Sequence, residues 1–146
     1  DFIGAKSENE VVFVRGATEA INLVAGFWGM AILLACDGCG SSSLEHHSNI
    51  VPWQQLAERT GARVRWVDID DQGRLDMDSL RTQLSERTRL LAVTAVSNVL
   101  GTINTLAEII ELAHQQGARV LVVDIDGEQA GRVAGELRDL GYAGDS

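Results

Sequence analysis

A hydroxyl and two imidazoles lie at two places in this sequence just before a helical stretch. Gly16-Ala17-Thr18 comes directly after residues 11–14 and opens a helical stretch, so free backbone N–H groups and a threonine hydroxyl there would suit an anion such as phosphate. Glu45-His46-His47 sets two imidazoles in a loop ahead of another helix. Each motif also has an ordinary structural explanation, a helix cap for the first and a solvated or capping histidine for the second.

Amide and carboxylate side chains follow two further apolar runs. Ser97-Asn98 comes after a run that ends near Val96, and Asp126-Gly127-Glu128-Gln129 comes after residues 120–124. An asparagine or an Asp-Gly pair in a loop is often only a turn. Taken together, however, the four places offer partners for a phosphate, a ring and the substituents of that ring.

The elements that must position these residues alternate along the chain. Residues 11–14, 63–67, 90–96 and 120–124 are predicted strands, because they are rich in β-branched and apolar side chains. Helices are predicted over residues 19–28, 50–59, 77–84, 106–113 and 128–140, with Asp76 as an N-cap and Gly61, Gly117 and Gly141 as stops. This order predicts an α/β fold of three layers around a mainly parallel sheet, with the ligand at the carboxyl ends of the strands.

Composition narrows the class of protein. The chain has 146 residues, 45% of them hydrophobic, which suits one globular domain with a core. No apolar stretch is long enough to span a membrane and the first residues do not resemble a signal peptide, so a cytoplasmic protein is expected. A formal charge of −9 disfavours nucleic acid and anionic membranes as partners. The partners expected are small molecules and proteins.

Three segments of the sequence resemble one enzyme family, in order and in spacing. They are Arg15-Gly16-Ala17-Thr18-Glu19 within residues 13–25, Glu45-His46-His47-Ser48-Asn49 within residues 45–54, and Val96-Ser97-Asn98 within residues 96–102. They are similar to consecutive motifs of the cysteine desulfurases and selenocysteine lyases, which are class V aminotransferase-like enzymes that use pyridoxal 5′-phosphate (PLP). The resemblance covers most of residues 2–122.

That resemblance implies a fold, a reaction and partners. The fold would be the large domain of the aspartate aminotransferase type. The reaction would take sulfur from L-cysteine, or selenium from L-selenocysteine, and in the cysteine case would leave L-alanine and a persulfide for iron–sulfur cluster assembly. The partners would be a sulfur-acceptor protein and a second copy of the chain in a homodimer.

The resemblance also implies roles for individual residues. Thr18 and the N–H groups around Ala17 would hold the cofactor phosphate, although Ala17 stands where the family usually has a second threonine. His46 would stack on the pyridine ring, and Asn98 with Gln129 would bind the ring hydroxyl. Asp126 would pair with the ring nitrogen, where its charge would keep the ring an electron sink.

Two segments depart from the family pattern. Residues 124–125 look like an insertion before Asp126, and because strand faces repeat every two residues, Asp124 is an alternative partner of the ring nitrogen. We favour Asp126. Residues 36–43 stand where the family has a buried strand, but glycine and serine are poor residues for one, so no strand is expected there. From Gly131 onward the resemblance fades.

The catalytic residues of the family have no counterpart in this chain. The only lysine is Lys6, far from the family's Schiff-base motif, so that lysine and the persulfide-forming cysteine are expected beyond Ser146. Residues 1–146 are therefore expected to be a partial PLP-binding large domain that is inactive alone. Two alternatives stay open: a non-catalytic α/β binding or structural domain, and a zinc or redox site at Cys36 and Cys39 with the nearby histidines. A nucleotide site is disfavoured, because no Gly-x-Gly-x-x-Gly follows residues 11–14.

Overall fold

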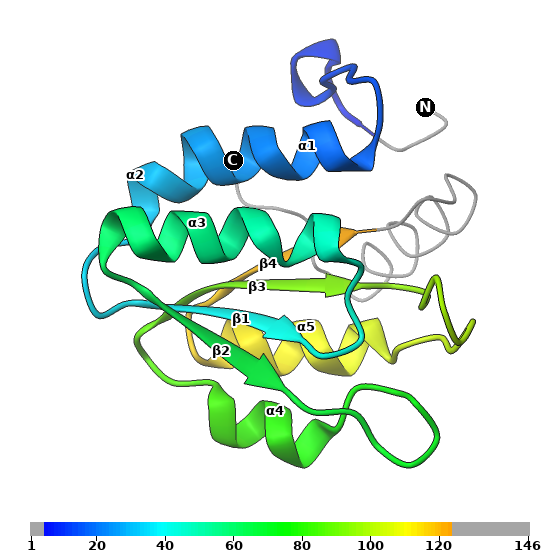
Figure 1. Ribbon diagram of the computed structural model, residues 1–146. Helices are drawn as coiled ribbons and strands as arrows, with labels where there is room; N and C mark the ends of the chain where they lie inside the picture. The colour runs from blue at the N-terminus through cyan, green and yellow to red at the C-terminus, as the bar shows by residue number, and fades with distance from the viewer. Residues whose placement is uncertain (1–4, 124–146) are drawn as a thin grey trace.

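The structure is a computed structural model that describes residues 5–123. Its centre is a parallel four-stranded sheet in the order β2-β1-β3-β4 (Figure 1). The strands are β1 (Gly38–Ser42), β2 (Arg63–Val67), β3 (Thr88–Thr94) and β4 (Arg119–Val123), and all three neighbouring pairs are parallel. The predicted α/β fold with a mainly parallel sheet is thus confirmed.

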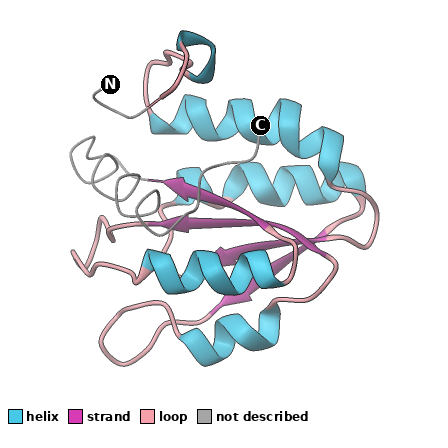
Figure 2. Ribbon diagram, turned by 180° about the vertical axis from the view of Figure 1, so that it is seen from behind, coloured by secondary structure: helices cyan, strands magenta, loops and turns pink. Residues whose placement is uncertain are grey.

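Helices cover both faces of the sheet and make the outer two layers. One face carries α1 (Ala17–Leu23), a π-helical turn η2 (Val24–Gly29), α2 (Met30–Ile32) and α3 (Val51–Thr60). The other face carries α4 (Met77–Gln83) and α5 (Leu106–Gln115), and Figure 2 shows α5 in front of the strands from that side. Two short 3-10 helices, η1 (Glu8–Glu10) and η3 (His47–Asn49), precede α1 and α3.

Each face has its own apolar core. On the α1 and α3 side, Trp53 is fully buried and packs with Leu56, Ile21 and Leu90. On the α4 and α5 side the core contains Leu80, Leu91, Val93 and the buried face of α5, which is Leu106, Ile109, Ile110 and Ala113. This is the i, i+3, i+4, i+7 stripe that predicted a helix over these residues.

The local signals for helix ends correspond to the structure. Asp76 caps α4 by accepting hydrogen bonds from two backbone N–H groups in its first turn. Gly61 follows α3 at φ +75°, and Gly117 lies just beyond α5 at φ +74°. Both are left-handed positions that glycine adopts without strain. The predicted helix over residues 128–140 lies outside the described residues.

The predicted strand over residues 11–14 is wrong. These residues form no strand within the described part of the chain, and Phe13 is 95% exposed. A β-branched run forms a strand only when a neighbouring strand takes its backbone N–H and C=O groups. Among residues 5–123 no strand lies beside this segment, so the sheet begins with β1.

The expectation that residues 36–43 would not form a strand is also wrong. Gly38–Ser42 is β1, a completely buried strand with β2 on one side and β3 on the other. Neighbouring side chains fill the volume that a larger residue in β1 would occupy: a Cβ atom added to Gly40 would lie 2.7 Å from Leu91 Cδ1. The small residue at position 40 therefore matches the large Leu91 on the neighbouring strand β3.

Candidate functional site

The candidate site is the edge of the sheet where the parallel strands end. In Figure 1 the arrowheads of β1, β3 and β4 point to the right, and the first turns of α1 and α3 lie on the same side. The segments that carry Thr18, His46 and Asn98 therefore reach the same edge of the domain. Asp124, Asp126 and Gln129 follow β4 but lie outside the described residues, so their roles stay predictions.

Thr18 lies in the first turn of α1 and is exposed. Gly16 occupies the N-cap position and provides no side-chain cap. Among the described residues, no acceptor outside the helix receives the N–H groups of Ala17 and Thr18 or the Thr18 hydroxyl. These donors, at the positive end of the helix dipole, suit a phosphate.

Glu19 lies in the same turn, but its carboxylate is bonded to Arg15. Its carboxylate accepts hydrogen bonds from Arg15 N at 2.7 Å and from the Arg15 guanidinium at 3.0 and 3.2 Å. The Arg15 hydrogen bonds hold the pKa of Glu19 below its ordinary value. The Glu19 carboxylate is thus paired with Arg15 and does not accept from the N–H groups of Ala17 and Thr18, which stay open to an anion.

A small apolar cavity lies beside this helix terminus. It has a volume of about 120 Å³, and its wall is formed on one side by α1 and on the other by β4: Ala17, Ala20, Ile21, Val24, Leu121, Val122 and Val123. The first turn of α1 is thus next to the carboxyl end of β4. The residues predicted to bind the ring nitrogen and ring hydroxyl follow β4 directly in the sequence.

His46 connects β1 to η3 and is half-buried. Its Nδ1 accepts a hydrogen bond from Ser48 N at 3.2 Å and lies 2.8 Å from Ser48 Oγ. A neutral imidazole held in this way carries its proton on Nε2. One face of the ring contacts the His47 ring, with 3.8 Å between centroids. The Nδ1 atom of His46 therefore caps a helical turn. The face of the imidazole opposite His47 contacts no other aromatic ring among the described residues.

Asn98 lies in an exposed turn after β3. Gly101 N donates to Ser97 O at 2.9 Å, and Ser97 Oγ accepts from the N–H groups of Val99 and Leu100. This turn is built by the serine and by Gly101 at φ +69°. The Asn98 amide makes no hydrogen bond with the described residues, so it is available to a ligand.

Glu45 is a residue of this edge whose role the sequence reasoning missed. It is 8% exposed, and its Oε1 accepts from Ser42 Oγ at 2.7 Å and Thr94 N at 2.8 Å. Its Oε2 accepts from Asn49 Nδ2 at 2.8 Å, and Asn49 Oδ1 accepts from Trp53 Nε1 at 2.9 Å. Burial raises the pKa of Glu45, and these hydrogen bonds oppose the rise. The four-residue spacing of Asn49 and Trp53 at the start of α3 is a signal that was available, because residues four apart meet on a helical turn. Glu45 precedes η3, so this rule does not extend to it.

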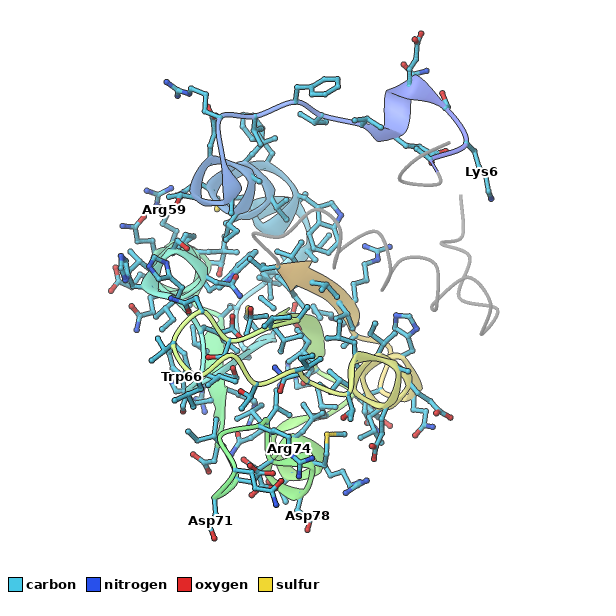
Figure 3. All side chains as sticks on the ribbon, turned by 90° about the vertical axis from the view of Figure 1, so that its right-hand side faces the viewer. Lys6, Arg59, Trp66, Asp71, Arg74 and Asp78 are labelled. Carbon is cyan, nitrogen blue, oxygen red and sulfur yellow. The ribbon has the colours of Figure 1, made fainter. Side chains whose placement is uncertain are left out.

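The remaining candidates lie away from this edge. Cys39 is in β1, where burial raises the pKa of its thiol to about 12, whereas Cys36 is exposed. Within residues 5–123 no three His, Cys, Asp or Glu side chains gather as a metal site would require. Lys6 lies in the segment before η1, at the edge of the molecule and apart from the sheet (Figure 3). No helix in the described part of the chain is long and apolar enough to cross a bilayer.

Comparison with known proteins decides the family. The model of the aminotransferase class-V family matches residues 1–131. The chain belongs to this family. A cysteine desulfurase of Shigella sonnei is 57% identical over 129 residues, which are 88% of this chain and 31% of that protein. The chain thus spans about a third of the length of the curated relatives it matches.

Two solved structures agree with the fold. The cysteine desulfurase CsdA of Escherichia coli superposes with a TM-score of 0.84 at 35% identity, over 96% of this chain and 35% of that chain. A more distant protein, the cystine C-S lyase C-DES, was solved in complex with its product cysteine persulfide and superposes with a TM-score of 0.67 over 77% of this chain and 30% of that chain. At 23% identity C-DES shows the fold alone. Class-V membership implies PLP as the cofactor.

Proposed function

We propose that this chain is the cofactor-binding part of a PLP-dependent cysteine desulfurase. The observation that carries the proposal is the common edge: the open helix terminus at Thr18, the imidazole of His46 and the amide of Asn98 all lie at the carboxyl ends of the sheet. A phosphate donor set, a ring face and an amide are the contacts that PLP needs. The close relationship to cysteine desulfurases supports the same interpretation.

In this proposal each residue binds a different part of PLP. The N–H groups of Ala17 and Thr18 and the Thr18 hydroxyl hold the phosphate, and His46 stacks on the ring. Asn98 and Gln129 bind the ring hydroxyl, and Asp126, with Asp124 as the alternative, pairs with the ring nitrogen. PLP, when bound, supplies an electron sink for the negative charge that develops at the α-carbon of cysteine. The carboxylate keeps the ring nitrogen protonated, which maintains that sink.

The reaction proposed for the whole enzyme takes sulfur from L-cysteine, or selenium from L-selenocysteine. The sulfur passes as a persulfide to an acceptor protein for iron–sulfur cluster assembly, in a cytoplasmic homodimer. These points rest on the family alone. The lysine that anchors the cofactor and the cysteine that takes the sulfur are not provided by Lys6, Cys36 or Cys39, so we propose that residues 1–146 act as a partial large domain that binds PLP reversibly and does not release sulfide.

The test is equilibrium dialysis of the purified chain against PLP and against pyridoxal, which lacks the phosphate. We expect Thr18→Val to weaken PLP binding roughly tenfold, because it removes a hydrogen bond to a charged group, and to leave pyridoxal binding unchanged. Thr82→Val is the matched control, since Thr82 is an exposed helical threonine on α4, whose hydroxyl bonds to its own helix. Equal affinity for PLP and pyridoxal would contradict the phosphate site.

The same samples test the catalytic part of the proposal. We expect no sulfide from L-cysteine above that of free PLP, and no borohydride-stable adduct that is lost in Lys6→Arg. An adduct on Lys6 accompanied by sulfide release would show that the chain contains its own anchoring lysine.

A further inference from the structure

The hydrogen bonds of Glu45 have a fixed direction. Trp53 Nε1 can only donate, so Asn49 must turn its Oδ1 toward the indole and its Nδ2 toward Glu45. Thr94 N, at the end of β3, can also only donate. Glu45 therefore meets donors at both of its oxygens. These donors, with the Ser42 hydroxyl, require an acceptor at Glu45, which an ionised carboxylate supplies.

The carboxylate of Glu45 connects three elements at the candidate site. Oε1 bonds to Ser42 at the end of β1 and lies 2.8 Å from Thr94 N at the end of β3. Oε2 bonds to Asn49, the last residue of η3, which leads into α3. His46 is the next residue in the sequence. The loop that carries the imidazole is thus fixed to the sheet on one side and to the turn before α3 on the other.

The cost of this arrangement indicates a purpose beyond packing. A buried carboxylate loses its hydration, and apolar residues of the same volume usually stabilise a core as well or better. The Glu45 carboxylate nevertheless accepts from β1, β3 and η3 at once, which no other side chain among residues 5–123 does. It sets the position of the loop relative to the sheet, which apolar contacts fix less strictly.

We propose that Glu45 is a positioning residue for His46: its carboxylate, oriented by Asn49 and Trp53, holds the imidazole where it stacks on the cofactor ring. The stacking part of this inference rests on the proposed function. The ordering of His46 does not, because it is a property of the chain without any ligand.

The direction of the hydrogen bonds gives a sharp test. Glu45→Gln keeps the shape of the side chain but sets an N–H₂ group against either Asn49 Nδ2 or Thr94 N, so one buried donor loses its acceptor. Asn49→Asp alone sets two carboxylates against each other. In the double variant, the amide introduced at position 45 would accept from Thr94 N and donate to the carboxylate introduced at position 49. That carboxylate would also accept from Trp53 Nε1, so every hydrogen bond returns, and the net charge is that of the wild type.

Two measurements compare these variants with the wild type. The first is NMR of the chain without ligand, in which the ¹⁵N shifts of the His46 ring report its Nε2–H tautomer and hydrogen exchange reports the protection of Ser48 N–H. We expect Glu45→Gln to mix the tautomers and reduce the protection, and the double variant to restore both. The second is dialysis against PLP, where we expect an affinity loss of about three- to tenfold for Glu45→Gln, the size of an aromatic stacking contact. That loss should disappear in a His46→Ala background.

Each outcome decides a separate question. If Glu45→Gln leaves the His46 signals unchanged, or the double variant is no better than the single ones, the positioning role is wrong. If the NMR results are as expected but even the wild type does not bind PLP, the positioning role stands and the proposed function fails. If Glu45→Gln does not fold, the double variant decides: wild-type His46 signals support the role, and an unfolded double variant overturns it.

Discussion

Gly40→Ala should destabilise the chain far more than Gly38→Ala, although both substitutions add one methyl group to β1. The added Cβ at position 40 would lie 2.7 Å from Cδ1 of Leu91, a fully buried side chain in the core shared with α5. At position 38 the nearest atom is 3.5 Å away, which is an ordinary contact. Overpacking of a filled core costs about 1–3 kcal/mol, so we expect a loss of that size for Gly40→Ala and a change near zero for Gly38→Ala.

The assay is urea unfolding of the two variants and the wild type, followed by circular dichroism. The midpoint should fall for Gly40→Ala with an unchanged slope, since the surface exposed on unfolding stays the same. Leu91→Val removes the clashing methyl, so Gly40→Ala should cost less in that background than in the wild type. Equal losses for the two glycine variants would refute the explanation that Leu91 fills the space above Gly40.

Three further predictions concern single side chains. Ala17→Thr restores a hydroxyl beside the helix terminus and should strengthen PLP binding several-fold, measured by dialysis with pyridoxal as the control. Burial raises the pKa of Glu45 above its ordinary 4.5, so the folded chain holds this proton more tightly than the unfolded chain; stability should fall as the pH rises from 4.5 through the raised value. Glu45→Gln should remove that part of the slope, and an identical pH profile in the variant would contradict the assignment. Iodoacetamide at pH 8 should modify Cys36 in the folded chain but not Cys39, whose thiol has a pKa of about 12, and labelling of both thiols before unfolding, read by mass spectrometry, would contradict this.

Elements with local signals were predictable from the sequence. The cap at Asp76, the stop at Gly61 and the apolar stripe of α5 depend on residues a few positions apart, and the structure has each of them. Residues 11–14 were predicted to form a strand and do not, whereas β1 forms although no strand was predicted there. Whether an extended segment becomes a strand depends on what lies beside it, and that neighbour is distant in the sequence.

The candidate site divides in the same way. That Asn98 would reach this edge follows from the parallel sheet, because the segment after a strand emerges at that edge. His46 also follows a strand, but β1 was not predicted, and Thr18 reaches the edge from the first turn of α1, since residues 11–14 form no strand. The Glu45 hydrogen bonds could not be inferred from the motif alone, since Thr94 lies 49 residues away. The roles of Asp126 and Gln129 stay predictions.

The composition of β1 and the hydrogen bonds of Glu45 have a common cause. Gly40 leaves the space that Leu91 fills, and Ser42, two residues on, is small enough for a buried strand while its hydroxyl donates to Glu45. Valine or isoleucine at these positions would suit an average buried strand better. At position 40 they would collide with Leu91, and at position 42 they would take a donor from the carboxylate. The residues that made this segment look unlike a strand are therefore the ones that let it pack in the middle of the sheet and anchor the His46 loop at its end.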